Sequence, residues 1–63
     1  MNTAWVMKYY RGEAEWLDLD TIRRTRRECV AVSMAKLASL EMGWPKLRKF
    51  MDIDPVKVEV KQL

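Results

Sequence analysis

The stretch from residue 25 to residue 45 constrains the fold most, because it carries both a helix start and a helix stop. Thr25 and Glu28 form a capping box, in which each side chain satisfies a backbone amide at the start of a helix. Gly43 suits the left-handed position just after a helix, and the Trp-Pro pair that follows it cannot continue one. An earlier start competes with the one at Thr25, namely a helix that runs through Ile22 and is capped by Asp20 or Thr21. We favour a main helix from Arg26 to Met42, to which a turn at residues 21–24 can be added.

This predicted helix has one apolar face and a second face with unusually little charge. The apolar stripe suits a core and is centred on Val30, Met34, Leu37 and Ala38. The other side is small and uncharged enough for another helix to approach closely, with Val32, Ala35 and Ser39 at its centre. Two alternatives follow. These three residues form a helix–helix contact in a homo-oligomer, or residues 44–51 or a loop cover them within one chain.

The rest of the chain predicts short strands and one short helix. Residues 4–10 and 14–19 are strands in a hairpin, since Gly12 between them readily adopts the positive φ of a tight turn. Residues 44–51 are a short helix that places Leu47, Phe50 and Met51 inward. Residues 56–63 alternate valine with charge, which is typical of a half-buried strand whose valines face a core.

The order of these elements predicts an α+β fold for a single small domain, residues 1–63. A small three-stranded antiparallel sheet, made of the hairpin and the last strand, packs on one main helix. The alternative is a mainly α-helical dimer, against which Gly12 and the pair Tyr9–Tyr10 argue. A chain of 63 residues buries only about 60% of its unfolded surface. Self-association is therefore a natural source of added stability.

The residue inventory excludes most catalytic and metal chemistry. The chain has no histidine and a single cysteine, Cys29, which excludes an internal disulfide, a histidine base and a closed Cys/His zinc site. Beside the arginines, Cys29 is either a reactive thiolate or, as we favour, a small apolar core residue. The acid pairs at 18/20 and 52/54 suit turns and caps. We predict no enzyme activity, no catalytic residue, no metal and no cofactor.

The most pointed feature is a cluster of four arginines, Arg23, Arg24, Arg26 and Arg27. Cations at a helix N-terminus oppose the helix dipole, so a negative group should compensate them. That group is internal, on Asp18, Asp20 or Glu28, or it belongs to a partner. The partner is then an acidic protein surface or nucleic-acid phosphate. The acidic block at residues 13–20 repels phosphate and favours a protein partner over nucleic acid.

The chain resembles small accessory proteins of temperate, lambdoid-type phages and prophages. The likeness rests on the early Trp-Val strand, the phrase DTIRRTRREC at 20–29, the tryptophan after the helix and the closing VKVEV at 56–60. The resemblance implies a protein of the early operon, between recombination and excision genes, that acts on host physiology through protein contacts. It carries over no functional residue.

The compartment and the partners follow from these features. One cysteine, no secretory signal and no long apolar run favour the host cell cytoplasm and no membrane contact. We expect a non-enzymatic accessory protein that binds a host or phage protein, as a monomer or homodimer. The alternative is a nucleic-acid-binding module that uses Arg23–Arg27.

Overall fold

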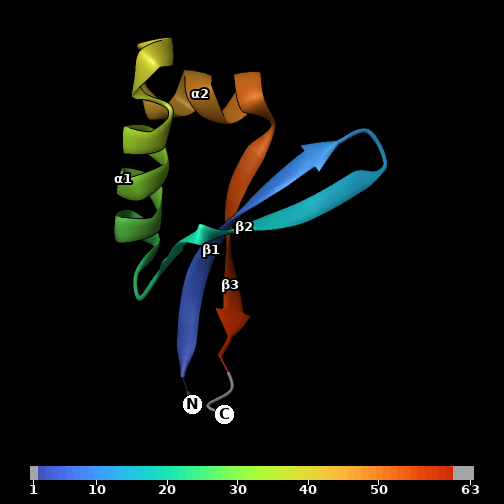
Figure 1. Cartoon of the computed structure of the whole chain (residues 1–63), viewed down its shortest axis with the longest axis vertical. Helices are drawn as coiled ribbons and strands as arrows, with labels where there is room; N and C mark the ends of the chain where they lie inside the picture. The colour runs from blue at the N-terminus through green and yellow to red at the C-terminus, as the bar shows by residue number, and fades with distance from the viewer. Residues whose placement is uncertain (1, 61–63) are drawn as a thin grey trace.

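A computed structural model describes residues 2–60 and confirms the predicted α+β fold (Figure 1). Its elements are β1 (Thr3–Arg11), β2 (Ala14–Arg23), α1 (Arg26–Lys36), a 3-10 turn η1 (Ala38–Leu40), α2 (Trp44–Met51) and β3 (Ile53–Glu59). The strands form one antiparallel sheet in the order β2-β1-β3, so the first strand is central. The mainly α-helical alternative is therefore wrong. Residues 61–63 of the predicted last strand lie outside the described residues.

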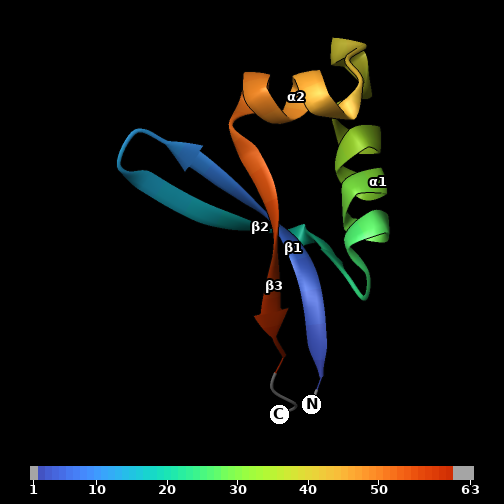
Figure 2. The ribbon, with the colours of Figure 1, turned by 180° about the vertical axis from the view of Figure 1, so that it is seen from behind.

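The β1–β2 hairpin is tightly turned at its tip and irregular at its other end (Figures 1 and 2). Gly12 has φ +59 in the turn, as predicted. The register slips between Trp5 and Met7, where β2 bulges. There the fully buried hydroxyl of Thr21 accepts a hydrogen bond from the Met7 amide at 2.9 Å and donates to the Asp18 carbonyl at 2.7 Å. One side chain thus replaces the missing ladder partner, so β2 extends to Arg23 rather than ending at residue 19.

The core lies where both helices meet one face of the sheet. Met7, Cys29 and Ile53 form its buried centre. Large side chains pack around this centre, namely Trp5, Tyr9, Leu37, Trp44 and Met51. In α1 the buried residues are Cys29 and Ser33, whereas Val30 and Met34 are half-buried. The predicted stripe was therefore rotated by about one residue, or 100° on a helix of 3.6 residues per turn.

The main helix starts as predicted and ends earlier. Thr25 caps it, accepting from the Glu28 amide at 3.1 Å and donating to the Glu28 carboxylate at 2.9 Å. The helix ends at Lys36, and Glu41, not Gly43, takes the left-handed conformation with φ 53. A helix continued to residue 42 would carry its end about 7.5 Å past Leu37, at 1.5 Å per residue. Packing of both Leu37 and Trp44 on one core requires the chain to turn between them.

Two predicted core faces are also corrected. In α2, Leu47 is buried but Phe50 is 63% exposed. In β3, register places Ile53 and Pro55 opposite Tyr9 and Met7 on the helix side. The valines at 56 and 58 therefore lie on the face away from the helices, because alternation along a strand separates neighbours. They are half-buried, as predicted, beside the buried Val6 and Ala4 of β1, whereas Val60 just beyond the strand is exposed.

Candidate binding surfaces

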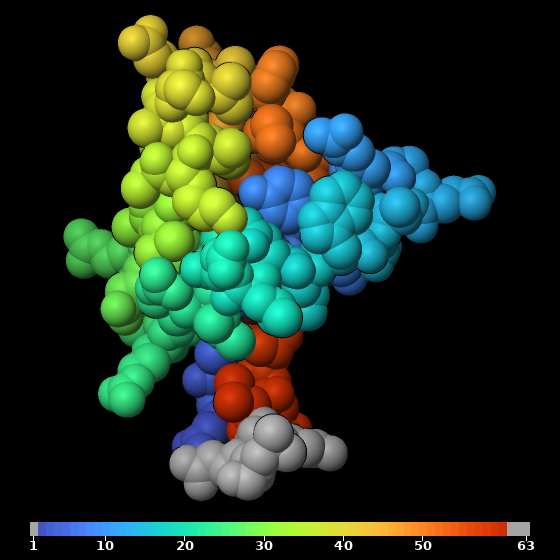
Figure 3. Space-filling model, viewed as in Figure 1, coloured from blue at the N-terminus to red at the C-terminus, as the bar shows by residue number. Residues whose placement is uncertain are grey.

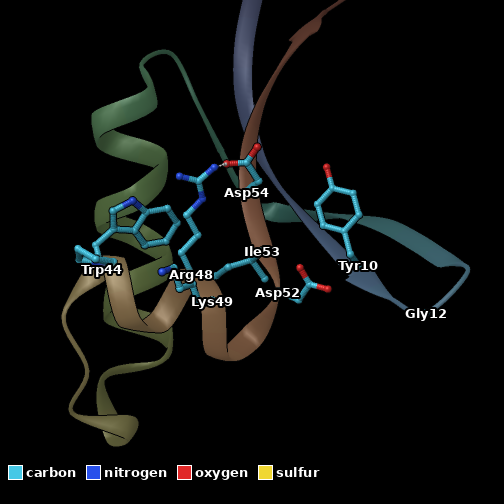
Figure 4. Close-up of a pocket in the computed structure, with 9 residues that line it drawn as sticks. Tyr10, Gly12, Trp44, Arg48, Lys49, Asp52, Ile53 and Asp54 are labelled. Atoms are coloured by element: carbon cyan, nitrogen blue, oxygen red, sulfur yellow. Dashed lines mark ion pairs between the residues drawn. The ribbon is translucent and has the colours of Figure 1, made fainter.

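A cleft of about 720 Å³ opens between α2, the start of β3 and the tip of the hairpin (Figure 4). Trp44, Arg48 and Lys49 come from α2, and Tyr10 comes from β1 across the cleft. Asp52 and buried Ile53 lie between these two sides. The cleft exists because the Tyr10 amide donates to the Asp52 carbonyl at 3.0 Å, which ties the end of α2 to the hairpin.

The cleft carries charges of both signs. Arg48 Nη2 lies 2.8 Å from Asp54 Oδ1, so this pair is internally matched and partly exposed. Lys49 and Asp52 take part in none of the ion pairs within residues 2–60. The two unmatched groups, with an aromatic ring on each side, suit a ligand that has both apolar surface and charge.

The arginine cluster lies at the junction of β2 and α1. Arg23 is half-buried and folds back, with Nη1 donating to the Ile22 carbonyl at 2.6 Å and to the Asp20 carbonyl at 3.3 Å. Arg24, Arg26 and Arg27 are exposed, and the side chains of this green segment project from the body of the molecule (Figure 3). None of the four takes part in an ion pair within the described chain.

The acids that could have matched the arginines are engaged elsewhere. Lys36 Nζ lies 2.6 Å from Asp18 Oδ2 and 3.9 Å from Asp20 Oδ2. The hydrogen bond that Lys36 donates to Asp18 is the main reason that the pKa of Lys36 is raised above its ordinary value. Glu28 accepts from Thr25 at the helix cap. A smaller cleft of about 370 Å³ borders Arg23, Arg24 and Glu28.

The structure places the remaining predicted residues apart or in the core. Val32 is half-buried and Ala35 is exposed on α1, while Ser39 lies beyond the helix end in η1. The predicted helix–helix contact would therefore span two elements. Cys29 is fully buried, and burial raises the pKa of its thiol, which keeps the thiol protonated at neutral pH. This environment is that of a core residue.

Sequence reasoning missed the cleft. Trp44 was assigned to a helix cap and Tyr10 to a strand face, and nothing in their spacing places them together. The one available signal was the run of Lys46, Arg48 and Lys49 on a helix too short to pair them with acids.

Comparisons with known proteins add no relative. No protein family model, curated protein or solved structure matches this chain. Among the described helices, none is both long and apolar enough to cross a membrane. Within residues 2–60, no three Cys, Asp or Glu side chains gather as a set of metal ligands.

Proposed function

We propose that this chain is a small, non-enzymatic accessory protein of the phage type that acts in the cytoplasm by binding a host or phage protein. The observation that carries the proposal is the cleft between α2 and the hairpin. Its walls include Trp44, Tyr10 and Arg48, and Trp, Tyr and Arg are the residue types that most often dominate binding energy at protein interfaces.

The chemistry of the cleft fits a segment of protein better than nucleic acid. An apolar side chain of the partner would lie between Trp44 and Tyr10. Its charged neighbours would pair with Lys49 or Asp52, which have no ion pair within the described chain. A phosphate backbone would meet the carboxylates of Asp52 and Asp54 in the same cleft, and burying like charges together is unfavourable.

Quantitative affinity capture with matched variants tests this proposal. Lys49→Glu changes a residue that lines the cleft, and Lys46→Glu makes the same charge change one helical turn away, outside the lining. We expect Lys49→Glu and Tyr10→Ala to lose proteins captured from host or infected-cell lysate, and Lys46→Glu to retain them. Titration calorimetry with the purified partner should then show at least about tenfold weaker binding for Lys49→Glu. Equal capture by all three variants would overturn the proposal.

A second candidate, nucleic-acid binding, is favoured by the exposed arginines at the start of α1. Arg24, Arg26 and Arg27 have no ion pair within residues 2–60. Fluorescence anisotropy with duplex DNA at several salt concentrations tests it, because counterion release makes binding fall steeply with salt. Absence of binding at low salt eliminates this candidate. Loss of captured proteins on changing the three arginines to Glu would instead assign the cluster to the protein partner.

A further inference from the structure

The outer edge of β3 is a further surface that the fold leaves open, besides the cleft and the arginine cluster. In the described chain β3 pairs only with β1, and both ribbon views show no segment on the other side of its lower half (Figures 1 and 2). The Val60 amide donates to the Asn2 carbonyl at 2.9 Å, and the Tyr10 amide donates to the Asp52 carbonyl at 3.0 Å. Even-numbered residues of β3 therefore turn their backbone groups toward β1.

The odd-numbered residues must then turn their amides and carbonyls outward, because these groups alternate along an antiparallel strand. They are Ile53, Pro55, Lys57 and Glu59. Pro55 is consistent with this assignment, since it lacks an amide and proline is confined to positions where no ladder donor is needed. The outward donors near the end of the strand are thus Lys57 and Glu59.

We propose that a second copy of this chain pairs with β3 in antiparallel fashion, around a two-fold axis at Val58. This register places Lys57 opposite Glu59 of the partner subunit, and Glu59 opposite Lys57 of the partner subunit. Both residues are exposed and have no ion pair within the described chain. Opposite charges directly across a sheet are stabilising, and like charges there are destabilising.

The registers centred on the two neighbouring outward residues are disfavoured by the same charges. An axis at Lys57 sets two lysines against each other, and an axis at Glu59 sets two glutamates against each other. An axis between residues would oppose an outward amide with an inward one, so no ladder would form. Among the registers centred on residues 57, 58 and 59, only the one centred on Val58 sets opposite charges against each other.

The valines of β3 support the same register. Val58 would lie opposite Val58 of the partner subunit, and Val56 opposite Val60 of the partner subunit. These side chains are on the face without helices, where Val60 is 39% exposed. β-Branched pairs across strands add to sheet stability. The contact is short because Pro55 offers no amide, so the dimer should be weak and dependent on concentration.

Sedimentation velocity from micromolar to millimolar concentration tests the pairing with charge reversals. Wild type should shift from 7.5 kDa toward twice that mass as concentration rises. Lys57→Glu alone and Glu59→Lys alone each place like charges in both pairs, and each should weaken the dimer by at least about tenfold. An equimolar mixture of the two variants restores opposite charges in both pairs, as does the double exchange in one chain, so both should dimerise.

Lys46→Glu and Glu13→Lys are matched controls that change charge away from β3 and should dimerise as wild type does. Far-UV circular dichroism confirms that each variant is folded. A wild-type monomer at millimolar concentration, or single reversals that dimerise normally, would overturn the proposal. A mixture that stays monomeric would overturn the register. The inference does not depend on the proposed cleft function, since Lys49 and Tyr10 lie outside the pairing.

Discussion

Replacing Thr21 is the sharpest test of how the sheet is held together. Its fully buried hydroxyl accepts from the Met7 amide at 2.9 Å and donates to the Asp18 carbonyl at 2.7 Å. Thr21→Val keeps the shape of the side chain and removes both hydrogen bonds. Thr21→Ser keeps the hydroxyl and removes only the methyl group. The pair of variants therefore separates the polar role of this residue from its packing role.

The structure sets the expected magnitudes. A buried backbone group left without a partner costs about 1–3 kcal/mol. Thr21→Val leaves the buried Met7 amide and the partly buried Asp18 carbonyl without their hydrogen-bond partner. We therefore expect a loss of about 2–4 kcal/mol in the free energy of unfolding. Thr21→Ser should lose about 1 kcal/mol for the methyl. The whole free energy of unfolding of a domain of this length is about 3–9 kcal/mol, so the Thr21→Val variant should be close to unfolding.

Urea unfolding followed by tryptophan fluorescence measures both variants. We expect the midpoint to fall for both, further for Thr21→Val, with an unchanged urea dependence of the unfolding free energy. If Thr21→Val were as stable as wild type, or more stable than Thr21→Ser, the hydroxyl would not be closing the bulge. The explanation of the β1–β2 register would then be wrong.

Three further predictions concern buried or strained groups. Ser33→Ala should raise the unfolding free energy by about 1 kcal/mol, because the buried Ser33 hydroxyl has no hydrogen-bond partner among the described residues; a lower urea midpoint would show an unseen partner. Glu41→Gly should stabilise by about 0.5–1 kcal/mol by relieving the left-handed backbone at φ 53. Gly43→Ala should not destabilise by strain or clash, because Gly43 has φ −70 and an added Cβ would make only an ordinary contact of 4.0 Å with Pro45 Cδ. Burial raises the pKa of Cys29 above its ordinary 9.0 and that of Tyr9 above 10.0. The unfolded chain then releases these protons first, so stability should fall as pH rises above about 9; thermal melts of Cys29→Ala should show the fall beginning at higher pH.

Local signals were enough to predict the kinds of element and several of their boundaries. The capping box at Thr25 predicted the start of α1 and Gly12 predicted the hairpin turn, because each depends on neighbours within a few residues. The end of α1 was not predictable in this way. A glycine before Trp-Pro is a strong stop signal, yet α1 ends at Lys36 because Leu37 and Trp44 must reach the same core. Tertiary packing, and not the local stop signal, therefore determines where α1 ends.

The faces of β3 and the cleft depend on information that one segment does not hold. Alternation in residues 56–60 predicted two faces and assigned the valines to a core, but it holds no information on which face meets the helices. That choice follows from the left-handed Asp52, which directs the chain so that Ile53 enters the core. The cleft joins residues 10–12 with residues 44–54, so only the pairing of β3 beside β1 assembles it.

The distribution of charge gives the strongest reason to prefer a protein partner to a polyanion. Nucleic acid gains from an uninterrupted positive surface. Here each candidate surface includes an acid beside some of its basic groups, since Glu28 shares a cleft with Arg23 and Arg24, and Asp52 shares one with Lys49. Lys36 pairs closely with Asp18 but not with Asp20, whose side chain remains 88% exposed and keeps negative charge at this surface. A partner with charges of both signs would match such a surface better than a phosphate backbone, which is why we propose a protein partner.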